Sequence, residues 1–225
     1  MELKTIAHIF TDFPEKFGIP RQSGLIPSLC GKIIFEPQYR TMDSLRGITD
    51  FSHLWLIWGF SEAKKENWAA TVAPPRLGGR KRMGVFATRA PYRPNPIALS
   101  SVSLIKIEND EKLGPVIYVS GVDMLSGTPI YDIKPYLPYC DCHFDAVGGF
   151  AEDVLSHALE VIFPPELLEK ILPEDIKSIR EILSQDPRTA FINDEERIWG
   201  VSYKNYNIRF TVKENILTVC EVSIS

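Results

Sequence analysis

The sequence has no long apolar run and little cysteine. Its most apolar stretch, FSHLWLIWGF at residues 51–60, is broken by Ser52 and His53 and falls short of the roughly twenty residues that a membrane-spanning helix needs. Acidic Glu2 and a short apolar segment argue against a secretory signal. Four cysteines in 225 residues do not make a disulfide scaffold. We therefore expect a soluble protein of a reducing compartment, the cytoplasm.

The signatures of the common nucleotide-binding and hydrolase folds are also missing. There is no G-x-G-x-x-G, no P-loop lysine motif and no G-x-S-x-G elbow. Long helical periodicity is absent before Pro164, which argues against strand–helix–strand alternation. Internal repeats and low-complexity segments are absent as well. A Rossmann-type architecture is therefore disfavoured.

Short runs of β-branched and aromatic residues fill the first two thirds of the chain, separated by loops with proline or glycine. We expect strands at Thr5–Phe10, Lys32–Phe35, His53–Phe60, Arg82–Thr88, Ile97–Ile107, Val116–Val122 and Ile130–Ile133. Strands of this kind without intervening helices predict a mainly β fold, a small antiparallel barrel or sandwich.

A boundary is expected near Tyr139–Phe150, where periodicity is lost. Beyond it the pattern predicts a strand, two helices and three further strands, at Ala158–Phe163, Glu166–Ile171, Glu174–Leu183, Arg197–Tyr203, Asn207–Val212 and Ile216–Val222. We expect residues 1–145 to form the β-rich domain and residues 150–225 a small α+β domain. The C-terminal domain is short enough that we expect it to depend on packing against the first domain for stability.

Charge is unevenly distributed along a chain whose net charge is −4. Residues 76–93 hold six cationic residues and no acidic one, whereas residues 145–196 hold 13 acidic and 4 cationic residues. A solvated charged face would give the same run, but a basic stretch on an acidic protein is typical of an anion site. Within residues 83–103, three prolines stiffen the backbone that carries Arg89, Arg93 and Asn95.

Three polar clusters interrupt the β-rich domain, at residues 19–24, 88–95 and 121–136. Each alone reads as a turn, a surface ion pair or a hairpin loop. Together they would supply the guanidinium, carboxylate, carboxamide and ring groups that a small-molecule pocket needs. Cys140-x-Cys142-His143 invites a zinc interpretation, but its spacing and the lack of a second cysteine pair favour ordinary loop thiols.

A series of motifs in a fixed order is specific enough to indicate a family: FSHLW at 51–55, PPRLGG at 74–79, GVFATR at 84–89, RPNPI at 93–97, GTP at 127–129 and DIKPY at 132–136. They resemble the TsaA-like domain of the TrmO family, S-adenosylmethionine-dependent tRNA N6-adenosine methyltransferases. The resemblance covers Leu3 to Asp141. It continues more weakly into residues 185–188, QDPR, which are similar to the C-terminal domain of bacterial members.

The resemblance implies a β-barrel methyltransferase in place of a Rossmann one. Members act on threonylcarbamoyladenosine at tRNA position 37, chiefly in threonine tRNA, and form homodimers with the cofactor near the subunit interface. The implied cofactor contacts are Pro20, Arg21, Gln22, Ser61, Glu62, Arg89, Leu99, Asp123, Met124, Leu125 and Ser126. The chemistry fits, because arginines can hold the cofactor carboxylate while Asp123 accepts from its ammonium or ribose hydroxyls. No metal and no membrane are expected.

A urea-type nitrogen is a weak nucleophile while it keeps its proton, so a base or an anion stabiliser is expected. Asp132 is the expected base or orienting group; Lys134 or Arg93 would offset negative charge, and Tyr136 would hydrogen-bond or stack. The expected RNA contacts are Arg80, Lys81, Arg82, Tyr92 and Arg188, with Arg93 and Asn95 at the rim where the RNA arrives.

Two alternatives have the same pocket motifs. One is a non-catalytic S-adenosylmethionine-binding sensor, for which the Asp132, Lys134 and Tyr136 cluster would have no obvious purpose. The other is a methyltransferase of a small molecule or a protein, against which the basic residues 80–82 argue only in part.

Overall fold

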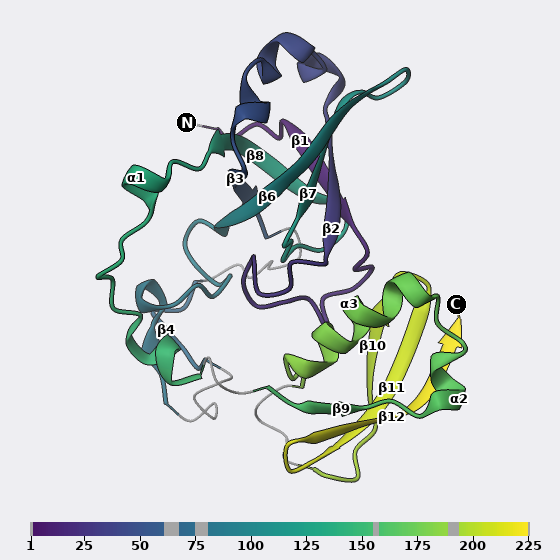
Figure 1. Cartoon of the computed structure of the whole chain (residues 1–225). Helices are drawn as coiled ribbons and strands as arrows, with labels where there is room; N and C mark the ends of the chain where they lie inside the picture. The colour runs from purple at the N-terminus through teal and green to yellow at the C-terminus, as the bar shows by residue number, and fades with distance from the viewer. Residues whose placement is uncertain (1, 61–67, 75–80, 155–157, 189–193, 225) are drawn as a thin grey trace.

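The structure is a computed structural model of the whole chain, and it describes residues 2–60, 68–74, 81–154, 158–188 and 194–224. Six strands close into a barrel in the order β1-β2-β7-β6-β3-β8, every neighbouring pair antiparallel (Figure 1). Their bounds are Ala7–Thr11 (β1), Cys30–Phe35 (β2), His53–Gly59 (β3), Ile97–Asp110 (β6), Gly114–Ser120 (β7) and Thr128–Pro135 (β8). The predicted mainly β fold with a small antiparallel barrel is confirmed.

Alternation along the strands builds the barrel core. On β3, Leu54, Leu56 and Trp58 point inward and are buried, while Trp55 and Ile57 lie on the outer face, half-buried. Closure pairs every strand on both edges, so the barrel leaves no free strand edge. Short 3₁₀ turns at Pro37–Tyr39 (η1), Met42–Leu45 (η2) and Ile48–Asp50 (η3) connect β2 to β3.

A two-stranded sheet of β4 (Thr71–Val72) and β5 (Met83–Gly84) lies outside the barrel. The predicted strand Arg82–Thr88 is wrong beyond Gly84, because the chain turns into a 3₁₀ helix at Val85–Ala87 (η5). The Thr88 hydroxyl and backbone amide both donate to the Val85 carbonyl, at 2.9 and 3.2 Å. This local bonding replaces the strand ladder that the apolar alternation had indicated.

The C-terminal part has a four-stranded sheet in the order β10-β11-β12-β9, with β9 parallel to β12. Its strands are Glu160–Ile162 (β9), Trp199–Tyr203 (β10), Tyr206–Lys213 (β11) and Ile216–Ile224 (β12). The helix α3 (Pro173–Ser184) starts at the predicted first-turn proline and lies between the sheet and the barrel (Figure 1). The helix α2 (Pro165–Leu168) is shorter than the predicted helix Glu166–Ile171. A short helix α1 (Pro138–Asp141) and a 3₁₀ turn η6 (Gly149–Val154) lie in the connection between the two parts.

The two parts pack directly against each other. Phe13 meets Tyr203 edge-on with ring centroids 5.6 Å apart, and the buried side chains of both parts form one continuous cluster. The amide of Lys204 donates to the Asp12 carbonyl at 2.8 Å. Among the described residues, no helix is both long and apolar enough to cross a membrane.

Candidate active site

A chain of hydrogen bonds links the barrel interior to Asp123. The indole of Trp58 donates to Ser100 Oγ at 2.9 Å, and Ser100 Oγ donates to Asp123 Oδ1 at 2.7 Å. Trp58 and Ser100 are both buried. Asp123 follows β7 at the point where the chain leaves the barrel through Gly121, whose positive φ of 75° few other residues tolerate. Ser100 of the barrel strand β6 therefore holds the carboxyl group in place.

The loop of residues 20–24 closes over Asp123. The amide of Gly24 donates to the Gly121 carbonyl at 2.9 Å, and the amide of Ser23 hydrogen-bonds the Asp123 carboxyl group. The guanidinium of Arg89 donates to the Gln22 side-chain oxygen. Pro20 is buried, whereas Arg21 is exposed. Three segments that the sequence singled out separately thus meet at one place.

Burial raises the pKa of Asp123 from its ordinary value of 3.8 to about 6. The hydrogen bond from Ser100, the amides of Asp123 and Ser23 and the charge of Arg89 act in the opposite direction and only partly offset the burial. A carboxyl group in this setting gains from a bound cation or from ribose hydroxyls that donate to it.

The segment 124–126 anchors the end of this site to β1. Met124 is fully buried, and its carbonyl accepts from Thr11 Oγ1 at 2.9 Å. The amide of Ser126 donates to the Phe13 carbonyl at 3.0 Å, and Ser126 Oγ accepts from the Thr11 amide at 3.3 Å. The Met124 side chain therefore belongs to the core, while Leu125 keeps a half-exposed side chain.

Two of the predicted catalytic residues, Asp132 and Lys134, lie on the outer face of the barrel. The register pairs Asp132 with Ile57 and Ile57 with Leu99, so these side chains form one row across β8, β3 and β6. Two strand spacings separate Asp132 from Leu99, about 10 Å. Lys134 Nζ lies 2.8 Å from Asp132 Oδ2, and Leu99 is 52% exposed. The predicted base and the predicted cofactor contact thus share one open face.

Aromatic rings continue this face beyond Lys134. Tyr136 packs against Trp55 and His53, with ring centroids 5.4 and 6.1 Å away. The indole of Trp55 donates to Asp141 Oδ2 at 2.8 Å, and the same oxygen accepts from the Leu137 amide. Partial burial raises the pKa of the Tyr136 hydroxyl. Tyr136 is therefore a fixed, neutral ring at the edge of the Asp132–Lys134 pair.

The predicted RNA contacts are spread over several elements. Lys81 and Arg82 are exposed, and Arg82 donates to Thr71 Oγ1 and the Thr71 carbonyl, at 2.8 and 2.6 Å. Arg93 donates to the Thr88 carbonyl at 2.7 Å, and Tyr92 is exposed. Ser61, Glu62 and Arg80 lie outside the described residues.

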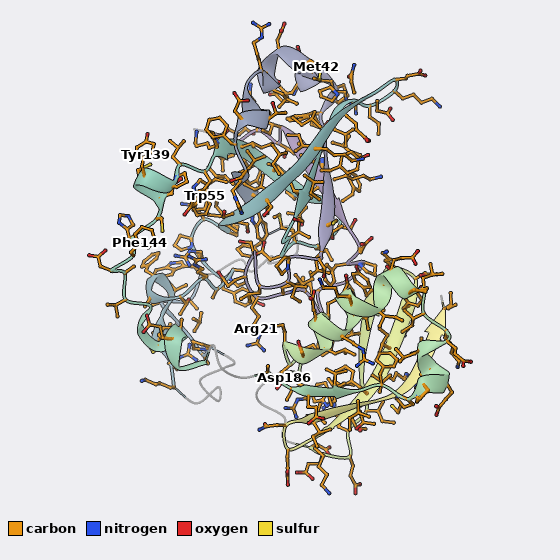
Figure 2. All side chains as sticks on the ribbon, viewed as in Figure 1. Arg21, Met42, Trp55, Tyr139, Phe144 and Asp186 are labelled. Atoms are coloured by element: carbon orange, nitrogen blue, oxygen red, sulfur yellow. The ribbon has the colours of Figure 1, made fainter. Side chains whose placement is uncertain are left out.

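Arg188 is bound to a neighbour in its own segment. Its Nε and Nη2 atoms donate to the two oxygens of Asp186 at 2.8 and 2.9 Å, and both side chains are largely shielded from solvent. The Arg188 carbonyl accepts from Arg21 at 3.4 Å, and Arg21 points toward the segment that holds Asp186 (Figure 2). The C-terminal part therefore reaches the loop of residues 20–24.

Sequence reasoning missed three side chains that organise the site. Ser100 is the buried link beneath Asp123, and Trp55 with Asp141 fixes the segment that follows Tyr136. A serine that interrupts an inward-facing apolar alternation was the available signal for Ser100. In the described residues, no three His, Cys, Asp or Glu side chains lie close enough together to hold a metal ion.

The donor set around Asp123 fits S-adenosylmethionine. The exposed guanidinium of Arg21 and the nearby one of Arg89 suit a carboxylate, and the half-buried Asp123 suits an ammonium or hydroxyl donor. Leu99 and Leu125 offer apolar surface to a purine.

Comparisons with known proteins match both parts of the chain. The family model described as tRNA-methyltransferase O N-terminal domain matches residues 8–142, and the TrmO C-terminal domain matches residues 156–225. A protein of Escherichia coli named tRNA (adenine(37)-N6)-methyltransferase is 38% identical over 95% of this chain and 94% of its own length.

Two further relatives come from Pseudomonas aeruginosa. One is named putative S-adenosylmethionine-dependent methyltransferase RcsF and is 39% identical over 83% of this chain and 77% of its own. The other is the crystal structure of TrmO from that organism, with a TM-score of 0.81 and 30% identity, covering 100% of this chain and 97% of the other.

Proposed function

The chain belongs to the TrmO family, and from that premise we propose that it methylates N6 of threonylcarbamoyladenosine at position 37 of threonine tRNA. As a member of this family it is an S-adenosylmethionine-dependent tRNA (adenine-N6)-methyltransferase. The observation that carries the proposal is the match of both parts of the chain to relatives with that activity in their names, over nearly their full length. The cluster of Gln22, Arg89 and Asp123 supports the cofactor assignment.

When bound, the cofactor supplies an electrophilic methyl group on a sulfonium centre. We assign its carboxylate to Arg21 or Arg89, its ammonium or ribose hydroxyls to Asp123, and its adenine to the surface at Leu99 and Leu125. The backbone of residues 124–126 would line the same site, together with Pro20 and Gln22. Ser61 and Glu62 complete the proposed set.

The residues on the outer face have separate proposed tasks. Asp132 accepts the proton that the urea-type nitrogen loses as its bond to the methyl carbon forms. Lys134, bound to Asp132, and Arg93 stabilise the negative charge that develops on the carbamoyl oxygen. Tyr136 holds the substrate by stacking or by its hydroxyl group. In-line alignment of donor and nucleophile is the main contribution of so rigid a site.

The partners and the setting of the enzyme follow the same proposal. We propose that Arg80, Lys81 and Arg82 bind phosphates of the anticodon arm, with Tyr92 and Arg188 as further contacts. We also propose a homodimer, a cytoplasmic location, and a division into a methyltransferase domain of residues 1–145 and a smaller domain of residues 150–225. Half-exposed apolar residues on the outer face, Leu99 among them, are consistent with a site that is covered on assembly.

The proposal is tested by incubating the protein with methyl-labelled cofactor and threonine tRNA that carries or lacks the threonylcarbamoyl group. The tRNA is then digested and its nucleosides are identified by mass spectrometry. We expect label on threonylcarbamoyladenosine only. Label on unmodified adenosine would contradict the substrate assignment, and cofactor binding without transfer to any RNA would identify a sensor.

A further inference from the structure

Two aromatic rings lie stacked on the surface outside the barrel. The ring centroids of Trp68 and Phe86 are 6.2 Å apart, with an angle of 29° between the planes. Trp68 is 51% exposed and Phe86 is 72% exposed. Leaving two large aromatic side chains in water forgoes the free energy of their burial. A stacked and exposed pair of this kind marks a contact surface.

The scaffold holds Phe86 rigidly outward. Pairing of β4 with β5 places Trp68 close to the turn η5, and the Val85 amide donates to the Ala70 carbonyl at 2.9 Å. Val85 is buried and anchors the turn, so the next residue, Phe86, is directed away from it. The bonds from Arg82 to Thr71 close the same unit. These contacts hold the turn that carries the Phe86 ring.

A cation and a carboxamide complete the surface. The Arg93 guanidinium lies 5.7 Å from the centroid of the Phe86 ring, and Arg93 is fixed by its bond to the Thr88 carbonyl. Phe86, Arg93, Pro94 and Asn95 line a cavity of about 220 Å³. That volume suits one planar ring better than a complete cofactor. Asn95 can donate and accept at the edge of such a ring.

The charge of the residues around this surface indicates which kind of partner it binds. The described stretches 68–74 and 81–97 hold four cationic residues and no acidic one: Lys81, Arg82, Arg89 and Arg93. Exposed rings, arginine planes and phosphate-binding cations together are the means by which proteins recognise unstacked bases of RNA loops. Because no acidic residue accompanies these cations, a polyanion such as RNA is the partner that the charge favours.

We propose that Trp68 and Phe86 form a stacking platform for an unpaired anticodon-loop base that neighbours the target adenosine, with Arg93 and Asn95 at its edge. The inference rests on the proposed function for its RNA and extends it by assigning the base contact. Arg89, three residues from Phe86, contacts Gln22 beside Asp123. Arg89 therefore links the segment that carries the platform to the loop at the proposed cofactor site.

The test compares Phe86→Leu and Trp68→Leu with Phe86→Tyr. We expect each leucine variant to raise the KM for tRNA roughly tenfold, because one base–aromatic contact is lost. Phe86→Tyr keeps the ring and should remain near the wild type. Phe10→Leu, which removes an exposed aromatic ring from β1, is the matched control and should change nothing. The Kd for cofactor and the melting temperature should be unchanged in all four.

A second measurement tests RNA binding at the platform without requiring methyl transfer. An RNA stem-loop with the sequence of the threonine anticodon arm should quench the fluorescence of Trp68, and Trp68→Phe should keep RNA affinity while losing most of the quench. An unchanged KM for tRNA in both leucine variants would overturn the proposal. So would a lower oligomeric mass in these variants, which would identify the surface as a contact between two copies of the chain. If the wild type transfers no methyl group to any tRNA, the proposed function fails, yet the quench still decides on the platform.

Discussion

Asp123 combines burial with a proposed role that requires its charge. Because its pKa is raised to about 6 by burial, the folded state holds the proton more tightly than the unfolded state, whose pKa is near 3.8. The stabilisation that the neutral carboxyl group gives is present below pH 3.8 and is lost as the pH rises toward 6. Above that range the ionised group costs stability, and a bound ammonium or hydroxyl donor offsets the cost.

Replacing Asp123 by asparagine should therefore separate stability from binding. At pH 7 we expect Asp123→Asn to raise the free energy of unfolding by about 1–2 kcal/mol, with no gain at pH 4. The Kd for cofactor should increase, and its improvement between pH 5 and pH 7 in the wild type should disappear. Urea unfolding and isothermal titration calorimetry at these pH values measure both effects. The exposed Asp43→Asn serves as control; a pH-independent Kd in the wild type would contradict the assignment.

Arg188 offers a second prediction at the scale of one residue. Its guanidinium is bound to Asp186 and its carbonyl accepts from Arg21. A substitution of Arg188 should therefore disturb the loop of residues 20–24. We expect Arg188→Gln, which loses the charge and the two parallel hydrogen bonds, to raise the Kd for cofactor about fivefold. Because the proposed RNA contact loses its cation as well, the dependence of the tRNA KM on salt should weaken.

The matched comparison is Lys81→Ala. This variant should leave the Kd for cofactor unchanged and reduce the salt slope of tRNA binding by about one counterion. If Arg188→Gln leaves the salt slope unchanged, Arg188 acts through the loop of residues 20–24 and does not contact RNA directly. Filter binding at a series of salt concentrations distinguishes the two outcomes.

At the scale of the element, the outer face of β8 holds the proposed base. Asp132 and Lys134 lie on the same side of the strand because they are two residues apart, and Lys134 binds Asp132 at 2.8 Å. Asp132→Asn should lower kcat at least about a hundredfold, without a change in the Kd for cofactor, because the proton acceptor is lost. Lys134→Gln should give a smaller loss.

Lys106→Gln is the control for this prediction, since Lys106 forms an exposed ion pair with Glu108 toward the other end of β6. Rates are measured by single turnover with saturating tRNA. A wild-type rate in Asp132→Asn would assign proton removal to another group or to water. Alkaline rescue of this variant would support the base assignment.

Elements were predictable from the sequence where one periodicity dominates. The inward alternation of β3 and the proline at the first turn of α3 are visible in the residues alone. The segment after Gly84 was not, because the Thr88 hydroxyl competes locally with the strand ladder. The motifs include segments that the structure brings together around Asp123, but the hydrogen bond from Ser100 to Asp123 depends on closure of the barrel, which brings together residues 23 positions apart.

At the scale of the whole molecule, a polar network around Asp175 in the C-terminal part reaches the barrel part through Lys204, whose amide donates to the Asp12 carbonyl. Asp175 of α3 is 3% exposed and accepts from Lys204 and from the Tyr206 hydroxyl group. Partial burial acts to lower the pKa of Lys204, but the bond to Asp175 and the nearby Asp12 raise it overall. Ser28, next to β2, binds Glu181 and Ser178 of the same helix. The barrel and the C-terminal sheet thus share polar partners as well as one apolar core.

We therefore expect the two parts to unfold in one transition. Circular dichroism follows the whole chain, and tryptophan fluorescence follows Trp58 in the barrel together with Trp199 in the sheet; the two melting curves should coincide. Asp175→Asn, which leaves Lys204 without its buried partner, should lower the free energy of unfolding by about 2 kcal/mol and the Tm by roughly 4–8 °C. The transition should stay single.

Arg209→Gln is the control in the same sheet, because Arg209 and Glu221 are an exposed pair whose loss should change stability by less than about 0.5 kcal/mol. Separate transitions in the wild type would contradict the shared core. A split that appears only in Asp175→Asn would instead show that the polar network, and not the contact of Phe13 with Tyr203, couples the C-terminal part to the loop that holds Asp123. In that case the Kd for cofactor should rise as the C-terminal part melts, since Arg188 reaches the loop from that side.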